Sequence, residues 1–341
     1  MTQSTDAEDL PNSNARPVTS SWLLRVFPNV SQSSIFIRAV IASFVILLVE
    51  FLVEVILLDL PYWGRPESFV RDPGVTLGAL GLIFGFVLLG QWGERYIELW
   101  KTVRPAFDVE DTKYSAVVQE NLDRLYGRDY VPFLLFVVVQ ISVYGFFGHE
   151  LPAGYLHVGF LHFLGVTALY GFYRHTVTIR SVTAMDLTDL SRARPILSEV
   201  ADFSVAVSLN WFGALAALSI YIGYFMGLDR EIGLFYAILV VFFVAIGLLV
   251  FAIPVVLLHE ALVDAKHKRL RELHQDYDTL FEEWRTDSLE GDPSVGLEIL
   301  ETRRRNVETI STWPYQLVSV SKLALGSVVP PLISVVQTFS G

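Results

Sequence analysis

The sequence predicts an all-α integral membrane protein with seven transmembrane helices. Hydrophobic residues make up 52% of its 341 positions and charged residues only 18%, which is more apolar than an ordinary soluble domain. The apolar residues gather in runs of about 20, the length that a helix needs to cross the hydrocarbon core of a bilayer. Lys and Arg gather in alternate connections between these runs, as the positive-inside rule requires of a multi-pass protein.

The predicted spans are separated by polar connections. The second and third are short and serines interrupt the last, so six spans with one re-entrant segment is the alternative count. The first span follows a tail rich in Ser, Asn, Asp and Thr without a basic n-region or cleavage site, so we expect it to be retained. The spans are residues 36–59, 74–92, 130–148, 154–173, 203–227, 232–258 and 314–339.

The distribution of positive charge predicts the orientation. If the N-terminus is inside, only Arg65, Arg71 and Arg230 fall on the outer side, and every other Lys and Arg between spans is cytoplasmic. Because positive residues are retained in the cytoplasm, we expect a multi-pass protein of the cell membrane with its N-terminus inside and its C-terminus outside.

The sixth helix is expected to continue far into the cytoplasm. No Gly-rich or Pro-Gly break interrupts the helical pattern over residues 232–284, where Gly247 and Pro254 lie well inside. This gives a rod of roughly 80 Å at 1.5 Å per residue, kinked at the proline. Asp292 and Pro293 then provide an N-cap and a first-turn proline for another helix. The two helices are predicted to form a cytoplasmic hairpin that leads into the last span.

The last span carries polar residues at helical spacing, on one face of an otherwise apolar helix. Small and hydroxyl residues allow close packing between helices, and a water-filled pore would equally remove the cost of polar groups in hydrocarbon. Both interpretations stay open, and a pore requires an oligomer because one helix per subunit cannot enclose it. The candidate pore-lining residues are Ser319, Lys322, Ser327, Pro330, Ser334, Gln337 and Thr338.

Lys322 also permits a different hypothesis, a retinal Schiff base as in microbial rhodopsins. Those proteins have an outside N-terminus, short loops and an aspartate one turn before the lysine, whereas Val318 occupies that place here. We therefore interpret Lys322 as a charge at the pore mouth or at an interface.

The order of these features resembles the insect olfactory and gustatory receptor superfamily, in the manner of a microbial gustatory receptor-like member. The shared features are the inside N-terminus, seven spans, a long sixth helix, a cytoplasmic helix before the last span and an ending close to Gln337 and Phe339. Thr338 separates these two residues, and the family's Thr-Tyr pair is absent. The resemblance implies a homotetrameric, ligand-gated ion channel with a split seventh helix that lines the pore.

The chain then divides into four predicted parts. They are a disordered cytoplasmic tail (1–33), spans one to six with cytoplasmic helical extensions (34–260), the cytoplasmic hairpin (261–312) and the pore-lining last span (313–341). The hairpin is the expected contact between subunits, through apolar residues spaced by three and four. Its candidate contact residues are Leu273, Tyr277, Leu280, Trp284, Leu300 and Val307.

Two further sets of residues are candidates for function. Glu50 and Glu54 lie one turn apart in the first span, where a carboxylate pair suits cation or proton handling. The alternative is that Glu54 lies near the outer interface with Asp59 and that Glu50 pairs with a neighbouring helix. Aromatic residues and a histidine at the outer ends of spans three to five suit either an interfacial belt or a pocket for an external small molecule. They are Tyr144, Tyr155, His157, Tyr221 and Tyr224.

Composition excludes several other classes. The net charge of −11, with few lysines, resembles proteins of salt-loving microbes and argues against a nucleic-acid partner. The chain has no cysteine, and no phosphate loop or hydrolase motif is present. We expect neither enzyme activity, cofactor nor metal. The expected partners are further copies of the chain and the lipid bilayer, and the rival functions are a secondary transporter and a non-conducting sensor or scaffold.

Overall fold

The computed structural model describes residues 35–56, 73–127, 130–147, 156–225, 230–286 and 293–314. Helix makes up 92% of this part of the chain, and it holds no β-strand. The predicted all-α class is confirmed. In order, the elements are α2 (Ile35–Ile56), α4 (Pro73–Val103), the 3₁₀ turn η3 (Arg104–Ala106), α5 (Asp111–Gly127), α6 (Tyr130–Phe147), α7 (Leu156–Thr183), α8 (Leu190–Phe225), α9 (Arg230–Arg285) and α10 (Pro293–Thr309).

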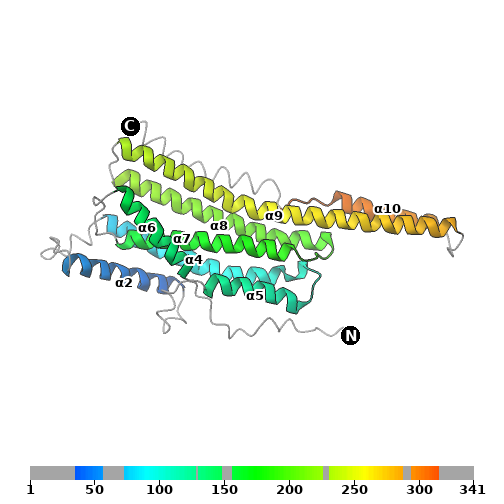
Figure 1. The fold of residues 1–341 in the computed structure, drawn as a ribbon, viewed down its shortest axis with the longest axis horizontal. Coiled ribbons are helices and arrows are strands. Elements are labelled where there is room, and N and C mark those ends of the chain that lie inside the picture. The colour runs from blue at the N-terminus through cyan, green and yellow to red at the C-terminus, as the bar shows by residue number, and fades with distance from the viewer. Residues whose placement is uncertain are drawn as a thin grey trace.

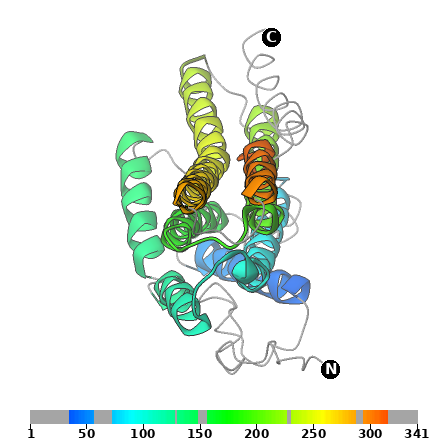
Figure 2. The same ribbon diagram turned by 90° about the vertical axis from the view of Figure 1, so that its right-hand side faces the viewer.

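The helices form one elongated bundle from which a hairpin projects (Figure 1). Helices α2, α4, α7, α8 and α9 lie alongside one another, α6 packs mainly on α7 at the edge of the bundle (Figure 2), and α10 packs back along α9. The far end of α9 and α10 extend beyond the other helices. The hairpin predicted from the sequence is therefore present.

The length of α9 and the start of α10 follow directly from sequence signals. Helix α9 runs for 56 residues without a break, through Pro254, and α10 begins at Pro293, the proline expected in its first turn. Helix α8 departs from expectation because it begins at Leu190, well before the predicted span at 203, and contains Pro195 near its start. The polar stretch 190–202 is helical because its buried face joins the largest apolar core.

Close packing of α8 on α9 depends on Gly247. A Cβ atom at this position would lie 2.7 Å from the ring of Phe212 and 2.8 Å from that of Trp211. The indole N–H of Trp211 also donates a hydrogen bond to the carbonyl of Phe243 on α9 (3.0 Å). Small residues at such crossings let two helices approach closely, as in membrane bundles.

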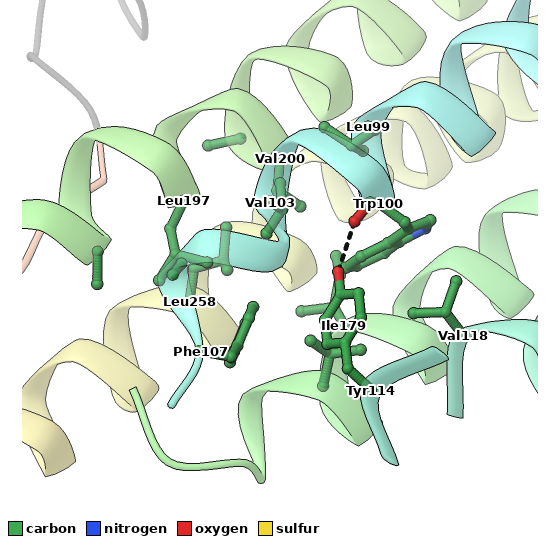
Figure 3. Close-up of a cluster of buried hydrophobic side chains, with 14 of the residues drawn as sticks. Leu99, Trp100, Val103, Phe107, Tyr114, Val118, Ile179, Leu197, Val200 and Leu258 are labelled. Atoms are coloured by element: carbon green, nitrogen blue, oxygen red, sulfur yellow. Dashed lines mark hydrogen bonds between the residues drawn. The ribbon is translucent and has the colours of Figure 1, made fainter. Parts of the chain in front are cut away.

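The largest apolar core lies where α4, η3, α5, α7, α8 and α9 converge (Figure 3). Tyr114 of α5 is fully buried there, and its hydroxyl donates to the carbonyl of Trp100 in the last turn of α4 (2.7 Å). Burial raises the pKa of the Tyr114 phenol, which stays protonated. Above the ring lies Arg104, whose guanidinium donates to the carbonyls of Phe107 and Val109 and pairs with Asp111. These bonds fix the turn between α4 and α5.

The exposed surface of the bundle changes from apolar to charged along several helices. On α4, Phe84 is exposed and apolar whereas Glu94 is exposed and charged; on α9 the change falls between Val256 and Glu260. Helix α2 exposes a phenylalanine or an aliphatic residue at every fourth position. These positions are Phe36, Val40, Phe44, Leu48 and Leu52. A water-facing bundle has no reason for such a surface.

Two of the described helices, α2 and α9, are long and apolar enough to cross a membrane. The coarse prediction of a helical protein with membrane-crossing segments therefore stands. Seven spans and the inside N-terminus remain predictions.

Candidate functional site

The chain leaves α10 through residues 308–314, which we call the junction segment. It leads directly towards the predicted last span. Lys266 of α9 donates hydrogen bonds from its ammonium group to the carbonyls of Glu308 (2.6 Å) and Ile310 (2.9 Å). The last carbonyls of a helix lack partners within the helix and carry partial negative charge, so a lysine at this position stabilises the end of α10.

Two more side chains hold the same segment. The ring of His259 on α9 stacks on that of Trp313, with centroids 4.0 Å apart and planes inclined by 11°. Its Nδ1 also donates to the carbonyl of Thr312 (3.1 Å), which fixes the tautomer with a proton on Nδ1. Arg194 of α8 donates from Nε to the carbonyl of Trp313 (3.3 Å). The junction segment is thus bound by two helices besides α10.

Sequence reasoning assigned no role to Arg194, His259 or Lys266. Their partners lie 42 to 119 positions away along the chain, and backbone carbonyls leave no trace in a sequence. The sequence did contain one signal for this site: a lysine and a histidine seven residues apart share one face of a helix. That signal is equally typical of a solvated helix face.

A buried polar layer lies beside the large core, where α4, α5, α7 and α8 meet. Tyr96 donates to Thr178 (2.9 Å), and Arg174 donates to the side-chain oxygen of Asn121 (2.7 Å). His175 lies 3.3 Å from the hydroxyl of Ser204 and makes an edge-on contact with the ring of Tyr96. This layer could not be predicted from the sequence because its members come from four helices.

Several buried atoms of this layer have no hydrogen-bond partner in the described part of the chain. They are Nε of Arg174, Nδ1 of His175 and Nε1 of Trp100. Buried polar atoms without partners cost free energy, so the surrounding apolar packing rather than hydrogen bonding alone maintains the layer.

The connection between α7 and α8 is tied to α9 by one exposed ion pair. Lys268 Nζ lies 2.6 Å from a carboxylate oxygen of Asp186. The hydrogen bond from Lys268 and its positive charge lower the pKa of Asp186, and the carboxylate correspondingly raises the pKa of Lys268. The pair lies beyond the predicted spans, on the side from which the hairpin projects.

The predicted pore-lining residues lie outside the described part of the chain. This applies to all seven, from Ser319 to Thr338. Their arrangement therefore remains a prediction of the sequence. The junction segment is the described part that lies nearest to them along the chain.

The predicted ligand-pocket residues are placed only by their helices. Tyr144 belongs to α6, His157 to α7, and Tyr221 and Tyr224 to α8, whereas Tyr155 lies outside the described residues. The parts of α6, α7 and α8 that carry them lie at the end of the bundle away from the hairpin (Figure 1). Whether the side chains converge remains a prediction.

Glu50 is buried on α2, at 1% exposure. Helix α2 packs on α4 and α7, so this carboxyl group faces protein rather than lipid, as both interpretations of the acidic pair require. Glu54 follows it by one turn in the same helix. The side chain of Glu54 is outside the described part, so no geometry joins the two carboxyl groups.

The predicted contact residues of the hairpin divide into inward and outward sets. Leu273 is buried, and Leu280 packs where a Cβ on Gly296 would come within 3.0 Å. Tyr277 and Trp284 are exposed. Of the α10 residues, Leu300 is half-buried and Val307 packs against the large core. The inward set joins the hairpin within one chain, and the outward set is available to a partner.

Comparison of the chain with models of known protein families, with characterised proteins and with solved structures finds no match. The fold and the site therefore define the class by themselves. It is a helical protein whose described part holds two helices able to cross a membrane and a projecting hairpin bound to the segment that enters the predicted last span.

Proposed function

We propose that this protein is a homotetrameric ion channel that crosses the cell membrane several times and forms its pore from the last predicted span of each subunit. The observation that carries the proposal is an exposed aromatic stripe on the projecting hairpin. Tyr277, Phe281 and Trp284 lie on successive turns of α9 and are all exposed, Trp284 by 51%. Val295 and Ile299 are exposed one turn apart on α10.

This stripe suits a second copy of the same chain. Clusters of exposed aromatic side chains are typical of interfaces. The part of α9 in the hairpin is acidic, through Asp276, Asp278, Glu282 and Glu283. Helix α10 carries three consecutive arginines at 303–305. Arg304 and Arg305 pair within α10, with Glu308 and Glu301, so the exposed apolar stripe rather than charge is the proposed contact between copies around a closed ring.

The apolar surface of the bundle supports the multi-pass part of the proposal. Exposed apolar side chains on α2, α4, α6 and α9 would be stabilised by lipid, and the charged exposed residues on α4 and α9 begin beyond them. The aromatic residues at the outer ends of spans three to five are the proposed site for an external small molecule that opens the channel.

The pore part of the proposal comes from the polar stripe of the last span. In a tetramer with touching hairpins, four junction segments surround one axis, and each delivers its last span towards that axis. Water at the axis would then hydrate Ser334 and Gln337. Transport by alternating access is the less favoured candidate, because the sequence shows no clear inverted repeat.

The oligomeric state tests the hairpin contact directly. Replacement of the exposed aromatic in Trp284→Ser should dissociate the purified tetramer, whereas Gln275→Ser, on the opposite face of the same helix, should leave it intact. Particle imaging and mass photometry in detergent measure the result. A wild-type monomer, or a tetramer unaffected by Trp284→Ser and Phe281→Ser together, would contradict the proposed contact.

Ion flux in liposomes tests conduction. Ser334→Leu should abolish flux by placing a bulky apolar side chain in the pore, and Val336→Leu, about 200° away around the predicted helix, should not. A tetramer without flux would indicate a sensor or scaffold. Flux that saturates with substrate and requires a coupled ion would indicate a transporter.

A further inference from the structure

The junction segment is held by polar contacts from distant helices, besides the packing of its Ile310 against the large apolar core. Four of its carbonyls, those of Glu308, Ile310, Thr312 and Trp313, accept hydrogen bonds from side chains of α8 and α9. Helix ends are more commonly closed by a local turn with glycine. Here the closing groups come from elsewhere in the fold, so the position of the segment depends on α8 and α9.

The aromatic stack reinforces this dependence. Trp313 remains 51% exposed, yet its ring lies nearly parallel to that of His259 at 4.0 Å. Burial alone does not force this geometry, since half of the indole faces outward. The histidine therefore contacts the segment twice, through its ring face and through Nδ1.

The three holding residues are connected by one continuous helix and its closest neighbour. His259 and Lys266 are seven residues apart and share a face of α9, which runs unbroken from the bundle to the tip of the hairpin. Arg194 lies on α8, which packs along α9. A shift of α9 would carry the junction segment with it.

We propose that Arg194, His259 and Lys266 form a latch that holds the junction segment to α8 and α9 and thereby sets the point from which the last predicted span departs. The latch consists of polar and stacking contacts at a largely exposed segment. Ile310 of the segment also packs against the large apolar core, so opening of the latch frees the residues that follow it. Its structural part is independent of the proposed channel function, and only its effect on conduction depends on that function.

Spin labelling tests the latch in the intact protein. Because the chain has no cysteine, Ser311→Cys places one nitroxide on the exposed centre of the junction segment. The continuous-wave electron paramagnetic resonance spectrum of this nitroxide should be that of a label with restricted motion. The latch variant Lys266→Met with His259→Ala should give the spectrum of a mobile label.

Matched variants separate the latch from a general loss of structure. Lys268→Met removes another exposed lysine of α9, the one that pairs with Asp186, and should leave the Ser311 spectrum restricted. Lys266→Arg, with His259 unchanged, retains N–H donors, so the label on residue 311 should stay mostly restricted. The thermal unfolding of the latch variant should resemble that of Lys268→Met. A label that stays restricted in the latch variant would overturn the proposal.

Liposome flux then tests the consequence for conduction. With the tetramer intact by particle imaging, the latch variant should change flux severalfold relative to Lys268→Met. An unchanged flux despite a mobile label would refute the claim that the latch sets the departure point of the pore helix. A wild-type protein without flux would end the proposed channel function, while the spin-label spectra would still decide whether the latch exists.

Discussion

At the scale of residues, buried hydrogen bonds and close contacts decide how the helices meet. Tyr114 donates a hydrogen bond to the carbonyl of Trp100 at the end of α4. Gly247 has no side chain and so leaves room for the aromatic rings of α8. Sequence reasoning identified neither partner, because each pair is brought together by the fold and not by spacing along the chain. Glu50 was predicted to be an intramembrane acid because an apolar run long enough for a membrane helix surrounds it. The structure buries its side chain against protein.

Loss of the Tyr114 hydroxyl should destabilise the core. In Tyr114→Phe the carbonyl of Trp100 loses its buried donor, which we expect to cost about 1–3 kcal/mol. Thermal unfolding in detergent, followed by circular dichroism, measures this loss. Tyr173→Phe, at an exposed tyrosine, is the control, and equal melting temperatures for the two variants would contradict the expected role.

The pair of Asp186 and Lys268 should make stability depend on pH at both extremes. The pKa of Asp186 is lowered in the folded protein, so its contribution is present above the unfolded pKa and is lost as pH falls through the folded value. The pKa of Lys268 is raised, so its contribution is present below the unfolded pKa and is lost as pH rises through the folded value. Lys268→Met should therefore lower the melting temperature at neutral pH, with a difference from wild type that shrinks in strong acid. A difference independent of pH would exclude the ion pair as its cause.

At the scale of elements, the sequence was most informative where a single helix carries its own signals. The length of α9 follows from the absence of a Gly-rich or Pro-Gly break, since Pro254 alone does not end the helix, and the start of α10 follows from Asp292 and Pro293. The early part of α8 was missed because residues 190–202 are polar and include Pro195, so only tertiary burial reveals their helical face. The latch was missed because its acceptors are backbone atoms.

The α8–α9 crossing should tolerate no added side chain at Gly247. Gly247→Ala would place a methyl group 2.7 Å from the buried ring of Phe212, and such overpacking typically costs about 1–3 kcal/mol. Gly213→Ala is the matched control, because nothing lies within 4 Å of a Cβ built there. We expect a lower melting temperature for the first variant only. An unchanged melting temperature for Gly247→Ala would show that the two helices separate easily.

At the scale of the whole molecule, the acidic charge and the apolar bundle surface imply two different environments. The exposed apolar side chains of the bundle suit lipid, and the charged residues of the hairpin suit water. The class of helical protein with membrane-crossing segments could be predicted from composition alone. Residues 315–341 lie outside the described part of the chain, and the last span stays a prediction of the sequence.

The net charge of −11 should make the protein more stable at high salt. Raising KCl from about 0.1 M to about 1 M shortens the screening length from roughly 10 Å to 3 Å and weakens repulsion among acidic residues. We expect the melting temperature to rise. A variant with Asp276, Asp278, Glu282 and Glu283 changed to amides should show a smaller rise, and an equal rise would assign the effect to other parts of the chain.

The unbroken length of α9 has a mechanical consequence. About 31 residues separate Pro254 from Arg285, which at 1.5 Å per residue makes an arm of roughly 46 Å. A tilt of about 5° at the proline would displace the hairpin tip by on the order of 4 Å, comparable to the spacing of adjacent turns. Small angular changes at Pro254 would therefore reach the tip of the hairpin as displacements large enough to exchange one set of side-chain contacts for the next.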